Sequence, residues 1–499
     1  MLAFPTSVRL GGVNKISGKK SPEFPRTLVF GASGYIGSHL VPRLLAEGHS
    51  LRAVARRSAP LETRGWRGVE ILEADALKPE TLSKVLTGVS IAYYLVHSMA
   101  SGRNFGPLDI EAAGNFAAAA AAAGVQRIVY LGGIVPEGAR SEHLLSRRDT
   151  GERLRSGAVP VIEIRAAVIV GAGSAAYEVI RDLVYHLPIM VTPKWVQSRS
   201  APIALENLLT YLVRVAELPE AEGQILDAGG PDFLSYEDMM RQFANCVGRR
   251  PFFLRVPLLT PDLSSRWLGL VTSVPTNVAR ALIQGLEYDI PAKDDRLLQL
   301  VPQRLLGFRE SVEAALKAEH RETGHGGPWV EGDLAFRNRK PDYAFYAKKA
   351  GGKAVANASP ASVWRQLSLM GGEHGYFYLD ILWQIRGALD WLIAGPGLCR
   401  RRPHPTELHL GDKLDFWTVI AIEPARRLTL SFDMKTPGAG VLEFELEEIG
   451  GKTQLTATAY WHPAGIWGLL YWYALVPLHI ILFEGMTKAI ARQAETNPI

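Results

Sequence analysis

Cysteine is almost absent from this chain, since Cys246 and Cys399 are its only two among 499 residues. Two cysteines that are so far apart exclude a disulfide scaffold and a CxxC zinc or redox site. So low a cysteine content is typical of proteins in a reducing compartment such as the cytosol. A strong charge of one sign is also missing, because 55 Lys and Arg face 50 Asp and Glu, for a net charge of +5. Without a basic stripe and interleaved aromatics, no nucleic-acid partner is expected, and the mild positive balance fits anionic small molecules or an anionic lipid surface.

The first 25 residues lack an apolar run long enough for a secretory signal, and their charges are almost all positive. We interpret residues 1–25 as a flexible basic leader, with an upstream start codon as the alternative. The length of 499 residues predicts two or three domains, and 47% hydrophobic with 21% charged residues is typical of a globular chain. We expect an N-terminal domain over 26–320, a polar, glycine-rich linker over 321–333 and a second domain over 334–499.

Short apolar strands alternate with helical segments in the first domain. The strand-like runs occupy 27–30, 51–57, 69–74, 90–96, 127–133 and 161–170. Such alternation predicts an α/β fold, with a Rossmann-like, doubly wound parallel sheet. Residues 234–320 are helix-rich and contain several prolines, so we predict a helical cap on the substrate side of this domain.

Three glycines follow the first strand in the sequence GASGYIG, residues 31–37. Gly31, Gly34 and Gly37 stand between a strand and a helix. There, glycine permits a tight turn and lets the backbone approach a pyrophosphate at the helix N-terminus. This context predicts a dinucleotide site in preference to a simple packing turn.

The end of the second strand indicates the type of cofactor. An NAD site usually has Asp or Glu about 20 residues past the glycines, whereas this chain has Arg56 and Arg57 and no acid from Leu51 to Leu61. Two guanidinium groups suit a ribose 2′-phosphate, so NADP(H) is the expected cofactor, with NAD as the alternative. Asp75, at the end of the third strand, is interpreted either as an acceptor for the adenine amino group or as a helix N-cap.

Several motifs resemble the atypical, NmrA-like short-chain dehydrogenase/reductases, in particular the bacterial YbjT group, in which this domain is fused to a C-terminal domain of unknown function. Besides GASGYIG, the resemblance depends on YYLVHSM (93–99), YLGGI (130–134) and VGAGSAAYEVIRDLVYHLP (170–188). It extends over nearly the whole chain from residue 26 and implies an NAD(P)-binding oxidoreductase. The cofactor contacts that it implies are Gly31, Ser33, Gly34, Tyr35, Ile36, Gly37, Arg56 and Asp75, with His97 and Ser98 on the nicotinamide side.

Residues 141–155, SEHLLSRRDTGERLR, contain neither tyrosine nor lysine. The resemblance implies a Tyr-x-x-x-Lys pair on this helix, in which the tyrosine exchanges the substrate proton and the lysine holds the ribose. Alignment through Glu152 puts Leu144 at the tyrosine position and Arg148 at the lysine position, and the usual serine position holds glycine. Arg148 keeps a cation for the ribose but cannot act as an acid. We therefore expect cofactor binding without the usual carbonyl chemistry.

Other candidate acids are few, and no catalytic residue or metal ligand is assigned. His97, at the carboxyl end of the fourth strand, is interpreted either as a proton donor or as a buried histidine bonded to the backbone. Tyr177 and Arg181, one helical turn apart, are expected either to face the substrate or to decorate a surface helix.

In the second domain, polar and apolar residues alternate in four runs separated by glycines, over 411–424, 427–434, 440–449 and 453–463. This pattern predicts an antiparallel meander, with a short helix over 359–372 before it and a long helix after it. The order resembles the helix-grip, START-like α+β proteins, in which a curved sheet wraps a helix around an apolar cavity. The resemblance implies an apolar or lipid-like ligand.

The last helix contains a run of twenty residues without charge, 464–483, which is long enough to cross a bilayer. Aromatic residues cluster at its start, as they do at membrane interfaces, whereas Pro477 and His479 lie within it. We favour a core helix with partial membrane contact over a true span, and hence a cytoplasmic, membrane-associated protein.

Two functions of different class follow from the sequence. The first is an NADP(H)-dependent oxidoreductase acting on an apolar, quinone-like or isoprenoid-like substrate, with a proton taken from water or from His97. The second is a non-catalytic NADP(H)-binding module, either a redox sensor or an accessory subunit, in which the cofactor stabilises the fold.

Overall fold

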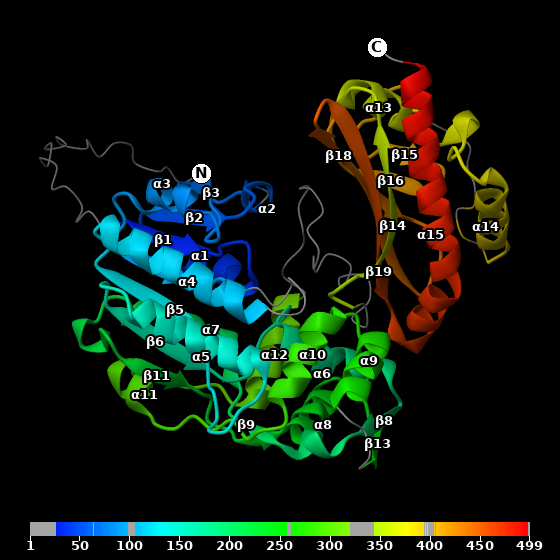
Figure 1. Ribbon diagram of the computed structural model, residues 1–499. Helices are drawn as coiled ribbons and strands as arrows, with labels where there is room; N and C mark the ends of the chain where they lie inside the picture. Colours follow the sequence, from blue (N-terminus) through cyan, green and yellow to red (C-terminus); the bar gives the residue numbers. More distant parts are fainter. Residues whose placement is uncertain are drawn as a thin grey trace, which may run out of the picture.

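The computed structural model describes residues 26–62, 64–97, 105–256, 261–319, 344–393 and 406–497, together with Gly395, Gly397 and His404. Figure 1 shows a layered N-terminal body, in blue to green, and a second body built on a separate sheet, in yellow to red. The predicted leader (1–25), the predicted linker (321–333) and Ser98 lie outside the described residues.

The centre of the N-terminal domain is a seven-stranded sheet in the order β11-β6-β5-β4-β1-β2-β3, with every pair parallel. Its strands are β1 (Thr27–Phe30), β2 (Leu51–Ala55), β3 (Glu70–Glu73), β4 (Ile91–Tyr94), β5 (Arg127–Gly133), β6 (Val161–Ala166) and β11 (Ile225–Ala228). All residues of β1, β2 and β4 are buried, as expected for a parallel sheet covered on both faces. The predicted doubly wound α/β sheet is confirmed.

Helices cover both faces of this sheet. One face packs on α1 (Tyr35–Ala46), α7 (Leu205–Val215) and α11 (Arg296–Leu300), and the other on α3 (Leu82–Leu86), α4 (Phe105–Ala122) and α5 (Glu142–Arg155). Because β1 lies between β2 and β4, the strand order reverses there. The carboxyl ends of β1 and β4 therefore flank the crevice in which doubly wound sheets bind ligands.

A helical cap packs on the carboxyl side of this domain and has its own apolar core. Its elements are α6 (Ala175–His186), β8 (Ile189–Thr192), α8 (Tyr236–Cys246), β13 (Phe252–Arg255), α9 (Pro261–Val271), α10 (Thr276–Gly285) and α12 (Phe308–Glu319). The cap thus begins earlier than residue 234, since α6 and β8 belong to it. Tyr177 and Arg181 are fully buried in this core, where Glu319 of α12 accepts a hydrogen bond from Tyr177 Oη at 3.2 Å and lies 3.4 Å from Arg181 Nε. The alternative that Tyr177 and Arg181 lie on the surface of a helix is therefore wrong.

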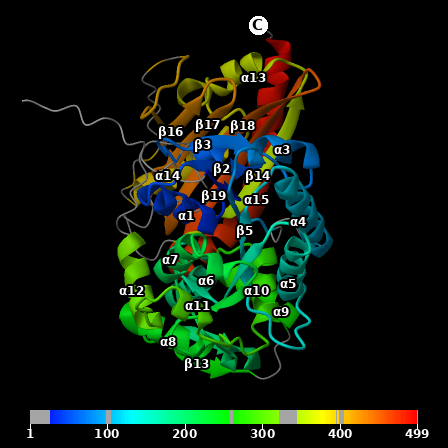
Figure 2. The same ribbon diagram turned by 90° about the vertical axis from the view of Figure 1, so that its left-hand side faces the viewer.

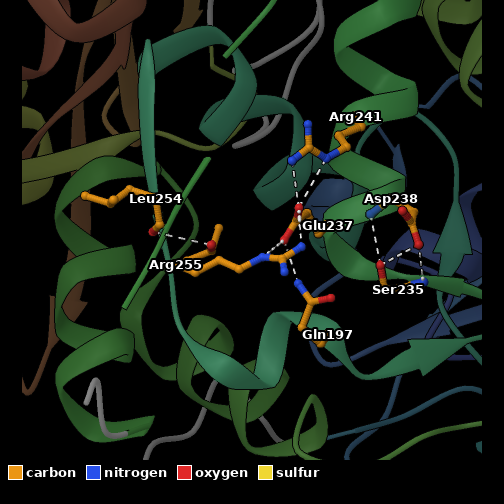
Figure 3. Close-up of polar contacts among 8 residues, drawn as sticks. Gln197, Ser235, Glu237, Asp238, Arg241, Leu254 and Arg255 are labelled. Carbon is orange, nitrogen blue, oxygen red and sulfur yellow. Dashed lines mark hydrogen bonds and ion pairs between the residues drawn. The ribbon is translucent and has the colours of Figure 1, made fainter. Parts of the chain in front are cut away.

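Figure 3 shows the polar contacts that hold α8 in the cap. The helix begins with a reciprocal capping box between Ser235 and Asp238. Glu237, which is buried, accepts hydrogen bonds from three side chains: Gln197, Arg241 and Arg255. Burial acts to raise the pKa of Glu237, but the hydrogen bonds from the arginines outweigh it and lower the pKa. This charged group is fully partnered, so we assign it a structural role.

The C-terminal domain is a six-stranded antiparallel sheet in the order β14-β19-β18-β17-β16-β15. Its strands are β14 (Lys348–Ala356), β15 (Lys413–Leu414), β16 (Trp417–Glu423), β17 (Arg427–Phe432), β18 (Gly438–Ile449) and β19 (Lys452–Pro463). Helices α13 (Pro360–Leu367) and α15 (Gly465–Thr496) pack on it, and α15 runs along the sheet in both views (Figure 1 and Figure 2). The predicted meander is confirmed, and the helix-grip, START-like arrangement stays a prediction.

The sequence does not predict β14 or the helix α14 (Asp380–Leu392). Strand β14 reads KKAGGKAVA, which has little β propensity. A Cβ atom on Gly351 would lie 2.2 Å from the Ala457 carbonyl oxygen in β19, and one on Gly352 would lie 2.4 Å from the Glu484 backbone nitrogen in α15. These glycines are therefore required by close packing between distant segments, which local propensity does not reveal.

Candidate active site

The glycine turn after β1 has the shape of a dinucleotide cradle. Gly31 has φ of +93°, and a Cβ atom there would lie 2.9 Å from the Leu95 carbonyl oxygen at the end of β4. A Cβ atom on Gly37 would lie 2.5 Å from the Gly31 carbonyl oxygen. Helix α1 begins after Gly34 with no side-chain cap and no acid in its first turn. Its first N–H groups can therefore meet a pyrophosphate.

The other residues of this turn lie around the cradle. Ser33 is exposed, while Tyr35 and Ile36 are partly buried in the first turn of α1. The Tyr35 ring packs on His39, with 4.9 Å between ring centroids. A Cβ atom on Gly171 would lie 2.4 Å from Tyr35 Oη, so Tyr35 contacts the loop that precedes α6.

The side chains expected to contact the adenosine half lie at the ends of β2 and β3. Arg56 and Arg57 follow β2 and are exposed. Asp75 is half-buried, and its Oδ1 accepts a hydrogen bond from the Leu77 N–H at 3.1 Å. This bond forms a local turn, and Asp75 is not the N-cap of the following 3₁₀ helix (Pro79–Thr81), because Lys78 holds that position. One carboxylate oxygen of Asp75 thus has a structural role in addition to the predicted contact.

Helix α5 presents a different arginine to the interior from the one aligned with the family lysine. Arg148 is exposed and pairs with Asp149 at 2.8 Å and with Glu152 at 3.7 Å. Its neighbour Arg147 turns inward and donates to the Leu131 carbonyl at the end of β5, at 3.1 Å. Leu144, at the tyrosine position, is buried.

A chain of hydrogen bonds begins at His97, just past β4. His97 Nδ1 lies 2.7 Å from Asp109 Oδ2 in α4, and His97 Nε2 lies 3.1 Å from His143 Nδ1 in α5. Ser146 Oγ donates to the same Asp109 oxygen at 2.7 Å. Asp109 and Ser146 are buried, and His143, at the end of this series of hydrogen bonds, is partly exposed. We call these four residues the histidine relay.

The Asp109 carboxylate determines where the protons of the relay lie. An ionised Asp109 can only accept, so His97 carries its proton on Nδ1. His97 Nε2 then accepts from His143 Nδ1, and the second nitrogen of His143 is left to take up or release a proton. This order of carboxylate, histidine and a third group that donates to the histidine resembles a catalytic triad in its logic, with a second histidine as the reacting group.

The surroundings of the relay keep both imidazoles neutral. Burial and the Arg147 guanidinium lower the pKa of His97 to about 4, although the hydrogen bond to Asp109 acts in the opposite direction. Burial, Arg147 and His97 lower the pKa of His143 well below its usual range. Perturbed groups that lie together at the carboxyl edge of such a sheet are typical of functional sites.

Sequence reasoning found one member of this relay and missed the others. His97 was identified from its place at the end of a strand. His143 stands directly before Leu144, but the alignment drew attention to the positions of the absent tyrosine and lysine. Asp109 and Ser146 carry no local signal, because only the packing of α4 beside α5 brings them to His97.

Two family models match separate parts of this chain. Residues 31–154 match a family described as NAD(P)H-binding, and residues 351–486 match a family described as protein of unknown function, DUF2867. The N-terminal domain is an NAD(P)H-binding Rossmann domain. A ceramide reductase of Caulobacter vibrioides is 25% identical over 50% of this chain and 80% of its own length. A (4-alkanoyl-5-oxo-2,5-dihydrofuran-3-yl)methyl phosphate reductase of Streptomyces griseus is 27% identical over 59% of this chain and 98% of its own.

Solved structures similar to the NAD(P)H-binding domain have lower identity. The triphenylmethane reductase of Citrobacter sp., complexed with NADP(H), is 19% identical with a TM-score of 0.49, over 58% of this chain and 99% of that chain. An NADPH-dependent quinone oxidoreductase of Escherichia coli, complexed with NADPH, is 16% identical with a TM-score of 0.46, over 58% of this chain and 99% of that chain.

Proposed function

We propose that this protein is an NADP(H)-dependent reductase of an apolar substrate, in which the histidine relay takes the place of the missing tyrosine and lysine. The observation that carries the proposal is the relay itself. Three elements, the end of β4, α4 and α5, bring His97, Asp109 and His143 into one hydrogen-bonded chain. It lies beside the crevice where the glycine turn would hold the dinucleotide.

When bound, NADPH supplies a hydride, so the protein must supply a proton. His143, protonated on its outer nitrogen, would donate that proton to the reduced substrate. His97 would orient the His143 ring through Nδ1 of His143, and the Asp109 carboxylate would stabilise the positive charge through His97. Ser146 holds the Asp109 carboxylate in place. His143 is the partly exposed end of the relay, so the proton would be replaced from solvent there.

The apolar character of the substrate is supported by the helical cap. A cavity of about 60 Å³ lies between α6, α8, α9 and α10, and its walls include Ile180, Met240, Trp267 and Leu282. Helix α10 packs against α5, which carries His143. Two relatives are named as reductases of ceramide and of an alkanoyl-bearing dihydrofuran methyl phosphate.

The arginines after β2 lead to a test of cofactor choice. Replacing Arg56 with Glu should lower the affinity for NADPH by about 1–3 kcal/mol, the worth of a charge-assisted hydrogen bond. The affinity for NADH should change little, because NADH lacks the 2′-phosphate. Isothermal calorimetry with both nucleotides measures the difference, with Arg64→Glu, at another position outside the strands, as the control. Equal affinities for NADPH and NADH in the unmodified protein would contradict the NADP(H) preference.

Reductase activity is tested directly by NADPH oxidation with a panel of acceptors. We expect turnover of quinones or long-chain ketones, and little turnover of small aldehydes and ketones, which would make few contacts with the apolar side chains of the cap. With a ketone acceptor, the product alcohol should carry deuterium on carbon from 4-deuterated NADPH, which excludes simple cofactor decay. A hydroquinone would lose the label to water and is detected directly as the product. If the protein binds NADPH and reduces none of the panel, the non-catalytic redox sensor is the better interpretation.

A further inference from the structure

One side of the molecule exposes large apolar side chains from both domains. On α14 they recur at positions 381, 385, 389 and 392, which is a single helical stripe. Trp391 and Leu392 are each 71% exposed, and Trp467 at the start of α15 is 73% exposed. The complete set, here called the apolar face, is Ile189, Phe252, Leu254, Leu270, Ile381, Ile385, Leu389, Trp391, Leu392, Ile393, Ile466, Trp467, Leu470 and Tyr473.

The elements that form the apolar face are neighbours in space. Helix α15 contacts α6 and α9, and Tyr473 Oη donates to the Leu270 carbonyl at 3.1 Å. Residues of α14 and α15 line one common cavity against the antiparallel sheet. Figure 1 shows α14, α15, α9 and β13 along the same side of the molecule. Monomeric soluble proteins rarely expose so many apolar side chains together, and such a face is typical of a binding surface.

Cations lie at the edge of the apolar face. A hollow of about 530 Å³ between the β8–β13 ribbon and the start of α15 is lined by Pro188, Arg249, Arg250 and Trp467. Both arginines are exposed, and Arg249 is held in place by its hydrogen bond to the Tyr185 carbonyl at 3.2 Å. At the other end, Lys435 donates to the Ile393 carbonyl at 3.3 Å.

The same elements contain few acidic residues: Asp262 in α9 and Asp380 and Asp390 in α14. Asp390 of α14 is fully buried, and its carboxylate accepts hydrogen bonds from backbone N–H groups, including that of Lys435. Helix α15 has no acid before Glu484, which lies 3.5 Å from Lys488. The apolar face therefore has a positive border. Two copies that met through it would bring like charges together, whereas an anionic lipid surface complements it.

We propose that the apolar face docks into one leaflet of an anionic lipid bilayer, and that Arg249 and Arg250 bind lipid phosphate in the hollow beside Trp467. Aromatic and aliphatic side chains with a cationic border are what interfacial helices use to lie in the membrane plane. Helix α15 docks in this way without spanning the bilayer, because the opposite side of its apolar run is fixed to the sheet through Trp472, Leu482 and Phe483.

The first test is vesicle flotation of the full-length protein, with phosphatidylcholine alone and with phosphatidylcholine mixed with phosphatidylglycerol. Trp391→Glu combined with Trp467→Glu should lower the partition coefficient at least about tenfold, because both charges would enter the apolar layer. The matched control is Ile449→Glu, a 51% exposed isoleucine at the far end of β18, which should bind like the unmodified protein. Circular dichroism and denaturant unfolding without vesicles show that the C-terminal domain of each variant is folded.

The second test isolates the cations. Arg249→Gln and Arg250→Gln should each lower binding to anionic vesicles by about fivefold and leave binding to phosphatidylcholine unchanged. Arg214→Gln, which removes an exposed arginine of α7, is the control. The proposal is overturned if the tryptophan variant partitions like the unmodified protein. It is also overturned if sedimentation shows a dimer that buries the apolar face. Resistance to alkaline carbonate extraction, which is typical of a spanning helix, would contradict it as well. None of these outcomes depends on reductase activity.

Discussion

Replacing His143 with asparagine is expected to lower the rate of NADPH-dependent reduction by about 10²–10⁴-fold, the usual worth of a positioned general acid. Asparagine can still accept and donate hydrogen bonds toward His97, so the fold and NADPH affinity should be kept. The measurement is kcat with the best acceptor of the panel, together with NADPH affinity by calorimetry. His409→Asn, which removes a 63% exposed histidine of the C-terminal domain, is the control and should leave both values unchanged.

The pH dependence of the same rate separates the relay from a proton taken from water. The pKa of His97 is lowered to about 4, and that of His143 is lowered as well, so the imidazolium form is a minor species at neutral pH. The reduction rate should therefore rise as the pH falls, by about tenfold per unit above the pKa of the relay. In His143→Asn this dependence should disappear. A rate of the unmodified protein that does not change between neutral and mildly acidic pH would exclude the relay as the donor.

Replacing Ile490 with alanine is expected to destabilise the C-terminal domain by about 2–5 kcal/mol, because the cavity left behind would lie in its core. Ile490 is fully buried in α15, whereas Ile481 on the same helix is 53% exposed. Ile481→Ala should therefore change the stability by less than about 0.5 kcal/mol. The pair makes the same chemical change on the two sides of one apolar helix.

The measurement for this pair is denaturant unfolding in the absence of lipid. Because a two-domain protein need not unfold in one step, the transition of the NAD(P)H-binding domain is identified by its shift on addition of NADPH. The Ile490→Ala effect should fall on the other transition. Equal losses for the two variants would show that α15 does not pack with one side in the domain core.

Much of the architecture could be predicted from periodicity and from glycine. Alternating apolar strands and helices determined the parallel sheet, because a buried parallel strand must be apolar on both faces. The GASGYIG turn predicted a dinucleotide site, and it is folded as that prediction requires, since the positive φ of Gly31 and the close contacts of Gly31 and Gly37 exclude other residues. The alternation between 411 and 463 determined the antiparallel meander in the same way. Each of these signals is local, because it arises within a few residues of the chain.

The chemistry of the site was decided by the tertiary structure. His97, Asp109 and His143 come from three separate elements, so their hydrogen bonds exist only after α4 and α5 pack on the sheet. Which arginine of α5 faces inward depends on the rotation of that helix, and the alignment selected Arg148 whereas Arg147 contacts the end of β5.

The tertiary structure also decided which side of the last helix is buried. Hydropathy describes 464–483 as apolar on every side, and the helix is long and apolar enough to cross a membrane by length and composition. Only the antiparallel sheet distinguishes its two sides, by covering one that includes Trp472 and leaving the one that includes Trp467 exposed. The periodicity of the sequence determines which residues of a helix can be buried together. Which part of the protein covers them depends on segments far away in the chain, and local sequence patterns contain no information about those segments.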